Sequence, residues 1–345
     1  MTARQSVVGL NLNPANPPAN GWASSALVEF DFFGVRPADN LQPQARVLNQ
    51  PRLRLAYLQI EKGVWKVTVG QDRAILAPID PVSLSHVAIP LGATAGNLWA
   101  WLPQVRVDRT QKFGETTALF QFGVLRPQFG DPALRDSPVA GTAIDSNFSG
   151  FGERSGHPFY QARMAFSHPM QGSTATVGAA AHYGRERVGS DRILDSWAFA
   201  LDLNIPLHSR LTLRGEGFVG KNLIPFQGGV LQGVAAVLPG RIRAIGAGGG
   251  WAELAIHPTA GNNNIFYVGA GTDDPRNAHL LPGITRSKNS FVWASYFRKL
   301  TDQISLASEW SNWQLRTVGF VALRPGPRGP FGSANVFNVA LAYQF

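Results

Sequence analysis

Arginine and carboxylate residues recur at alternate positions of otherwise apolar segments. The members of this set are Arg52, Arg54, Arg106, Asp108, Arg163, Arg214 and Glu216. A guanidinium group offers a planar fork of donors that matches the two oxygens of a carboxylate or phosphate. These residues could therefore recognise anionic solutes. Equally, Arg and Glu could pair with each other and brace the structure, and the sequence leaves both roles open.

Residues for bond-breaking chemistry are present but do not form a known motif. The chain has no cysteine, no GxSxG sequence and no HExxH pair, and IGAGGGW (245–251) lacks the GK[ST] ending of a phosphate loop. Ser167 and His182 fall on facing predicted strands and are the best candidate for a hydrolase pair. Asp273 and Asp274 are better explained as the polar start of a loop than as metal ligands. We therefore expect no enzymatic activity, no cofactor and no metal.

The elements that must position these charges have a period of two. In SWAFALDLNIPL (196–207), large apolar residues alternate with small or polar ones, which is typical of a strand with one apolar face. Fifteen such segments are predicted, near 4–13, 25–34, 52–62, 65–75, 98–110, 115–126, 158–168, 174–186, 195–207, 210–221, 243–257, 263–273, 289–300, 303–317 and 334–345.

The links between these segments are alternately short and long. EKGV (61–64) and PLHSR (206–210) are short, whereas 76–97 and 127–157 are long. Short periplasmic turns and longer external loops are typical of outer-membrane barrels. The sequence thus predicts an all-β fold, a transmembrane antiparallel β-barrel in the bacterial outer membrane, in contact with lipid. A soluble all-β binding protein remains the alternative fold.

The last strand carries an apolar stripe up to the final residue. Its members are Phe337, Val339, Leu341, Tyr343 and Phe345. In a closed barrel the last strand pairs with the first, so we expect these side chains to face lipid, with the two terminal aromatic rings at the periplasmic interface. The same stripe is the expected signal for the barrel-assembly machinery.

A first strand and a signal peptide are both missing from the start of the sequence, and we expect one explanation for both. Fifteen strands is odd, whereas bacterial single-chain barrels have even numbers, and MTARQSVVGL is unlike a signal peptide. We expect a single barrel domain over residues 1–345 that lacks its first strand and signal peptide, from a barrel of about sixteen strands.

The net charge of +9 indicates a positive interior. Lys and Arg are scattered rather than clustered, which argues against nucleic-acid binding. A charge that points to lipid at mid-bilayer costs roughly 2–4 kcal/mol, so the alternating arginines should face the lumen and favour small anionic solutes. Arg126 and Arg154 are weaker candidates, on a loop that could fold inward to form a constriction.

Several segments resemble the DcaP-like trimeric outer-membrane porins. They include TARQSVVGLNLN with VEFDFFG, PRLRLAYLQIEKGVWKVTVGQDRAILAP, GNLWAWLPQVRV, GAGTDDPRN and the terminal ALAYQF. The resemblance implies a sixteen-stranded barrel, a homotrimer, passage of negatively charged organic acids in some members, and an external loop folded into the lumen, here 76–97 or 127–157. A water-filled channel of about sixteen strands is also wide enough for passive diffusion of small hydrophilic solutes. The functional alternative is an outer-membrane barrel with a hydrolase site.

Overall fold

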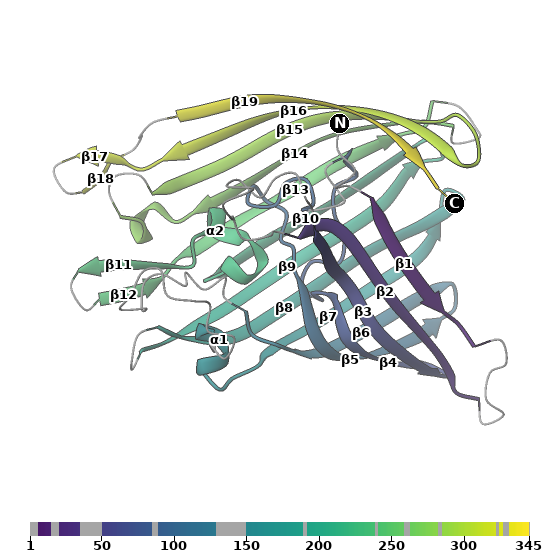
Figure 1. The fold of residues 1–345 in the computed structure, drawn as a ribbon, viewed down its shortest axis with the longest axis horizontal. Helices are drawn as coiled ribbons and strands as arrows, with labels where there is room; N and C mark the ends of the chain where they lie inside the picture. Colours follow the sequence, from purple (N-terminus) through teal and green to yellow (C-terminus); the bar gives the residue numbers. More distant parts are fainter. Residues whose placement is uncertain are drawn as a thin grey trace.

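A computed structural model gives the structure of this chain. It describes residues 6–14, 21–34, 50–84, 89–128, 150–188, 192–238, 241–258, 263–281, 285–321, 324–326 and 331–344. Most of these residues lie in one antiparallel sheet of fifteen strands that curls into a barrel-shaped wall (Figure 1). The all-β prediction is therefore confirmed.

Each predicted segment corresponds to one strand of the sheet. The strands are β1 (Val7–Leu12), β2 (Ala23–Gly34), β3 (Gln50–Lys62), β4 (Trp65–Arg73), β5 (Trp101–Phe113), β6 (Thr116–Leu125), β7 (Phe159–Met170), β8 (Ser173–Val188), β9 (Arg192–His208), β10 (Leu211–Lys221), β13 (Gly246–Ile256), β14 (Asn264–Pro275), β15 (Arg286–Lys299), β16 (Ile304–Thr317) and β19 (Phe331–Tyr343). Each strand pairs with the next one along the chain.

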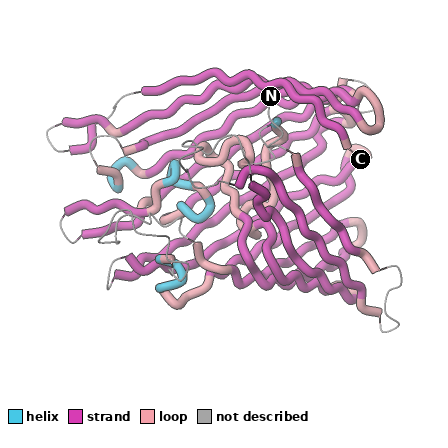
Figure 2. Tube along the Cα trace, in the orientation of Figure 1, coloured by secondary structure: helices cyan, strands magenta, loops and turns pink. Residues whose placement is uncertain are grey.

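The long links contain short elements that the sequence analysis missed. These are α1 (Phe151–Arg154), η2 (Ile224–Phe226), α2 (Gly228–Leu231), the hairpin of β11 (Val234–Leu238) and β12 (Arg241–Ala244), η3 (Asn277–His279), and the hairpin of β17 (Gly319–Val321) and β18 (Arg324–Gly326). They gather at one end of the wall and inside it, and the opposite end has short turns (Figure 2). Within the described ranges no helix has the length and apolarity to cross a membrane.

The expected pairing of the last strand with the first is not found. Among the described residues β1 pairs with β2 and β19 pairs with β16, and these two strands form the edges of the sheet. In an antiparallel sheet of fifteen consecutive strands the first and last run in the same direction, so they cannot complete the antiparallel ladder. The described wall is therefore open rather than a closed sixteen-stranded barrel.

Burial alternates along the strands as the period of two requires. On β7 the residues from Phe159 to Ala165 with odd numbers are buried, and Tyr160, Ala162 and Met164 between them are exposed. Large apolar side chains form the exposed set on most strands. A soluble protein rarely exposes so continuous an apolar surface, so the outward face has the character of a surface covered by lipid.

The apolar stripe of β19 lies on this exposed surface. Phe337, Val339, Leu341 and Tyr343 are all strongly exposed. Both faces of β19 are exposed along most of its length because it is an edge strand. Phe345, the remaining member of the predicted stripe, lies outside the described residues.

Candidate functional site

A segment of the first long link lies against the inner face of the wall. We call residues 74–84 the interior strap. The backbone N–H of Leu76 donates to the side-chain oxygen of Gln161 on β7 at 3.0 Å, and that of Ile79 donates to Glu216 on β10 at 3.0 Å. The strap then continues past β13 to β16, so it crosses much of the interior.

Two further wall carboxylates hold the far part of the strap. The Val82 N–H donates to Glu253 of β13 at 2.9 Å. Glu309 of β16 accepts both the Ser83 hydroxyl at 2.9 Å and the Leu84 N–H at 3.0 Å. Buried backbone donors must be satisfied, and here inward side chains from distant strands replace the missing neighbouring strand.

Three of the bonded donors of the strap follow the spacing of its prolines. The bonded N–H groups of Leu76, Ile79 and Val82 are three residues apart, and Pro78 and Pro81 have the same spacing. A polyproline II segment has three residues per turn, so its every third N–H points the same way. The prolines fix φ near that geometry and leave positions 78 and 81 without a backbone donor.

Asp80 connects the strap to two strands of the wall. Its carboxylate pairs with Arg73 at the end of β4 and accepts the Asn97 amide at 3.1 Å. Arg214 of β10 donates to the Asp80 carbonyl at 3.2 Å and also pairs with Glu253. Asp80 is thus the node at which the strap, its returning segment and the wall meet.

A second inward segment packs against the first. Phe226 of η2 is fully buried, and its carbonyl accepts the Trp99 N–H at 3.0 Å. Val230 has a left-handed φ of 52°, which is unfavourable for a β-branched residue. In that conformation its N–H donates to Asp273 of β14 at 2.9 Å. The interior is therefore narrowed by two segments, both attached to inward carboxylates.

Arg52 and Arg54 of β3 and Arg106 of β5 face the interior, and each of the three is in an ion pair. Arg52 bonds to Asp31 at 2.5 Å, and Arg54 bonds to Glu29 at 2.6 Å. Arg106 lies 2.9 Å from Asp72 and 3.2 Å from Asp108. Arg52 and Arg54 also lie over the Trp101 ring at 5.2 and 4.7 Å, close enough for cation–π attraction.

The remaining predicted wall residues are paired as well. Arg163 makes a two-pronged contact with Asp202, at 2.8 and 2.7 Å. Arg214 pairs with Glu253, and Glu216 holds the strap. The alternating arginines therefore brace the wall, whichever further role they have.

Exposure is unequal within several of these pairs. In four of them the cation keeps part of its side-chain surface exposed, whereas the carboxylate has almost none exposed. The side-chain exposures are 28% against 0% for Arg52–Asp31, 34% against 3% for Lys66–Asp108, 32% against 1% for Arg73–Asp80, and 21% against 0% for Arg214–Glu253. Arg54–Glu29 is reversed, at 9% against 23%, and Arg106–Asp72 is balanced. Such a pair presents mostly its positive end to water.

Lys66 and Arg73 were missed by the sequence analysis. Both lie on β4. Lys66 is separated from the inward residues Thr68 and Asp72 by an even number of positions, so the strand alternation alone could have identified it. Arg73 is the last residue of β4, where the strand gives way to the strap, and its inward direction depends on Asp80.

The loop candidates lie apart from these interior pairs. Arg126 follows β6 and bonds to Glu153 of α1 at 2.6 Å, with more than half of its side chain exposed. Arg154 ends α1. Most of the link 127–157 lies outside the described residues, so the segment seen to fold inward is the one at 76–97.

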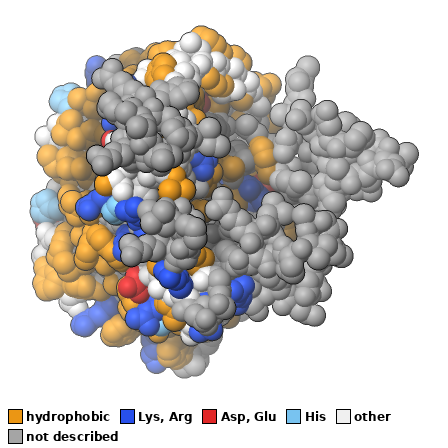
Figure 3. Space-filling view, turned by 90° about the vertical axis from the view of Figure 1, so that its left-hand side faces the viewer, with side chains coloured by type: hydrophobic (Ala, Val, Ile, Leu, Met, Phe, Trp, Pro, Cys, Tyr) orange, Lys and Arg blue, Asp and Glu red, His pale blue; other side chains and the backbone are white. Residues whose placement is uncertain are grey.

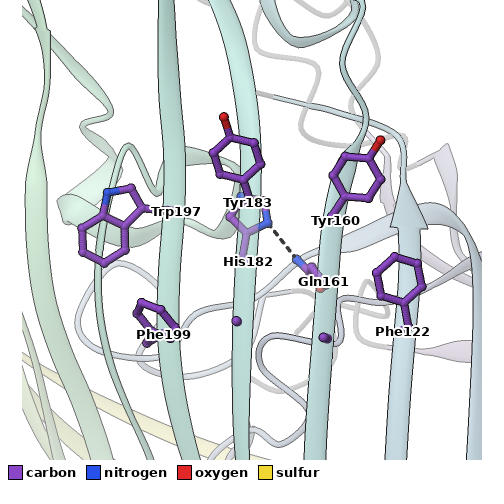
Figure 4. A pocket seen from close by; sticks show the side chains of 9 residues that line it. Phe122, Tyr160, Gln161, His182, Tyr183, Trp197 and Phe199 are labelled. Atoms are coloured by element: carbon purple, nitrogen blue, oxygen red, sulfur yellow. Dashed lines mark hydrogen bonds between the residues drawn. The ribbon is translucent and has the colours of Figure 1, made fainter.

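Ser167 and His182, the candidates for a hydrolase pair, lie on neighbouring strands but not side by side. Ser167 pairs in register with Thr176, six residues before His182, and strand residues six apart are separated by about 20 Å. His182 is buried, with its Nδ1 near the Gln161 amide at 3.4 Å (Figure 4). Its Nε2 lies 3.1 Å from the Ser196 hydroxyl, which donates to the Asn222 carbonyl at 2.8 Å. That hydroxyl is committed to a structural bond.

Solved structures with a similar fold are outer-membrane channels. The chain aligns over its whole length with 86% of the outer membrane channel DcaP of Acinetobacter baumannii, at 14% identity and a TM-score of 0.70. It also covers 91% of the anion-selective porin from Comamonas acidovorans, at 13% identity and a TM-score of 0.59. No protein-family model and no curated protein matches this sequence.

The expectation that the chain has no enzymatic activity does not stand. Structures of OmpT, an outer membrane protein of Vibrio cholerae, are also similar, at 11% identity and a TM-score of 0.53 for one of them. Identity this low shows the fold alone, and a barrel wall can support unrelated functions. The exclusion of an enzyme is therefore withdrawn.

The comparisons confirm the predicted resemblance to DcaP-like channels at the level of fold, and they support the predicted location in the outer membrane. A curled antiparallel wall, an apolar outer face and an inward-folded link all belong to this architecture. The chain has the fold of the outer-membrane porins.

Proposed function

We propose that this chain forms a water-filled channel in the outer membrane, through which small hydrophilic solutes diffuse passively, with a preference for anions such as carboxylates. The fold of its structural neighbours supports the channel. The observation that carries the anion preference is the unequal exposure within the interior ion pairs: Arg52, Lys66 and Arg73 reach water while their carboxylates are buried.

Charge at a narrow point acts more strongly than charge in open water. The interior strap reduces the cross-section, and Arg73 pairs with its central residue, Asp80. Fixed positive groups beside a constriction with low-dielectric walls raise the local concentration of anions and lower their entry barrier. A guanidinium group also fits two carboxylate oxygens at once, so a passing carboxylate can contact Arg52 or Arg73 without displacing the buried acid.

The strap supports the assignment of the constriction to residues 74–84. Its five hydrogen bonds to Gln161, Glu216, Glu253 and Glu309 fix it to the wall. A constriction attached at so many points keeps its width when solutes pass.

We further propose a homotrimer of single-domain barrels, assembled in lipid by the barrel-assembly machinery acting on the C-terminal strand. One similar structure is described as a trimer form of OmpT. Cross-linking in native membranes tests this assembly: a ladder ending at three copies is expected, and a monomer would contradict it.

Planar-bilayer recording tests the channel itself. We expect discrete conductance steps when the purified chain is added, and a reduction of the current when succinate is added to one side, because a dicarboxylate dwells at the exposed guanidinium groups. Neutral glycerol at equal concentration is the control. A protein that inserts into the bilayer but produces no steps would contradict the channel, and steps unaffected by succinate would contradict carboxylate recognition.

A further inference from the structure

A row of polar aromatic side chains crosses the outer wall near its long-link end. In register, Tyr160 pairs with Tyr183, and Tyr183 pairs with Trp197. Trp197 then pairs with Lys221, and Lys221 with Gly246. Trp and Tyr concentrate where membrane hydrocarbon meets water, so this row lies at the boundary of the apolar belt.

An apolar trough lies directly beside the aromatic part of this row. Two small residues, Ala162 and Ala181, pair with each other, and Phe122 and Phe199 flank them in register. The cavity has a volume of about 430 Å³ and is lined by these residues and the aromatic row (Figure 4). Its open and apolar form suits a hydrocarbon chain.

A group of cations surrounds Gly246, at the other end of the row. A Cβ on Gly246 would lie 3.2 Å from Cδ of Arg276 and 3.4 Å from Cε1 of His279, so both side chains lie over this glycine. The Arg243 guanidinium donates to the Ala278 carbonyl at 2.9 Å. Arg243, Arg276 and Lys221 thus converge on the outward side of β13. We call these three residues the rim cluster.

Acidic residues near the rim cluster have other partners. Asp273 accepts the Val230 N–H, Asp274 pairs with Lys288, and Asp195 pairs with Arg185. Within the described ranges no ion pair involves a member of the rim cluster. Lys and Arg predominate over carboxylates among the side chains drawn at this end (Figure 3).

The pKa of His279 reflects its burial and the positive charge of the rim cluster. Its Nδ1 accepts the backbone N–H of Gly246 at 3.0 Å, so Nε2 is the ring nitrogen left to contact another group. Burial lowers the pKa of His279, and the charges of Arg243, Arg276 and Lys221 lower it further. Because Nδ1 accepts the bond from Gly246, the ring carries its proton on Nε2 and can donate a hydrogen bond from there to an anion held by the rim cluster.

We propose that this outer face binds a phosphorylated lipid of the surrounding leaflet, with an acyl chain in the trough and the phosphate at the rim cluster. Trp197 lines the trough and pairs in register with Lys221, so one molecule can reach both parts. A free anion would leave the trough without a role. The proposal depends on the outward orientation of this wall and is independent of solute passage.

Lipid retention by the full chain tests the proposal. Native mass spectrometry from non-ionic detergent compares dioleoylphosphatidylglycerol with dioleoylphosphatidylcholine, whose choline neutralises the phosphate. We expect a preference for phosphatidylglycerol. Its affinity should fall roughly thirtyfold in the double variant Arg243→Gln/Arg276→Gln, because each cation contributes about fivefold. Ala181→Phe, which fills the trough, should weaken both lipids roughly tenfold.

Arg109→Gln is the matched control, because Arg109 is an outward arginine lying over Trp65 near the short-turn end. It should leave retention unchanged. Three results would overturn the proposal: equal retention of the two lipids, loss of phosphatidylglycerol to the same extent in Arg109→Gln, or displacement by inorganic phosphate together with insensitivity to Ala181→Phe. The last result would identify a soluble-anion site. Burial of the trough between two copies of the chain, seen as loss of oligomers in Ala181→Phe, would also overturn it.

Discussion

The two sides of the interior use the same residue types in different ways. On the side of β10, β13 and β16, the carboxylates of Glu216, Glu253 and Glu309 accept backbone N–H groups of the strap. On the side of β2 to β5, carboxylates such as Asp31 and Asp72 bind arginine side chains. The first arrangement fixes the strap to the wall, and in the second a cation such as Arg52 stays more exposed than its carboxylate. The inward position of a charged residue in the strand alternation therefore does not by itself tell whether its side chain contacts a solute.

Releasing the strap should have the largest effect. In the double variant Glu216→Ala/Glu253→Ala, the N–H groups of Ile79 and Val82 lose their acceptors, at about 1–3 kcal/mol each. Arg214 also loses its carboxylate partner. We expect a markedly larger and noisier single-channel conductance. Glu61→Ala, near the short turn after β3, serves as the control, and an unchanged conductance in the double variant would show that the strap is not the constriction.

Removing the Asp31 carboxylate should have the second-largest effect. Asp31 is fully buried and contacts both Arg52 and Arg54, so Asp31→Asn leaves buried positive charge with reduced compensation. Breaking a buried pair costs about 3–5 kcal/mol. The melting temperature should fall while the anion preference increases. A cooperative melt at the wild-type temperature would argue against this pair as a brace.

The prolines of the strap should have a smaller effect. Pro78→Ala/Pro81→Ala retains every hydrogen bond but increases the freedom of the unfolded segment, by about 0.4–1 kcal/mol per residue. We expect a slightly lower melting temperature and a broader distribution of open-channel currents, at unchanged selectivity. If the current distribution narrowed instead, the prolines would not be ordering the strap.

The exposed pair of Arg126 and Glu153 should have the least effect. Surface pairs contribute about 0–1 kcal/mol. The Gly150 N–H and then Arg126 lower the pKa of Glu153, so the stabilisation exists above the usual carboxyl pKa and is lost as the pH falls through the lowered value. In Arg126→Gln this acid loss should be smaller and should be complete at a higher pH. Thermal melts between pH 3 and pH 7 would measure it, and a change in ion selectivity would contradict the peripheral position of Arg126.

The period of two was sufficient to predict the wall. Each alternating segment, such as 196–207, forms a strand, and Arg54, Arg106 and Arg163 are buried at alternate positions of their strands. Strand alternation is local, so one sequence contains it. The odd number of predicted segments also indicated that these strands alone do not close an antiparallel sheet. Direct pairing of the last strand with the first was nevertheless expected.

The strap could not be predicted in the same way. Its bonds join residues 85 to 226 positions apart, and they use backbone donors that every sequence has. Two signals were present: the three-residue spacing of Pro78 and Pro81, and the inward carboxylates on β10, β13 and β16. Ser167 and His182 failed for the related reason that register, which the sequence did not specify, decides which side chains meet.

The reversal potential under a tenfold KCl gradient tests the central claim, that buried carboxylates leave cationic ends facing the water. The wild-type channel should show an anion preference, and Arg52→Gln/Arg73→Gln should shift the potential toward zero with little change in strand structure. A cation preference in the wild type, or an unchanged potential in the double variant, would contradict the account.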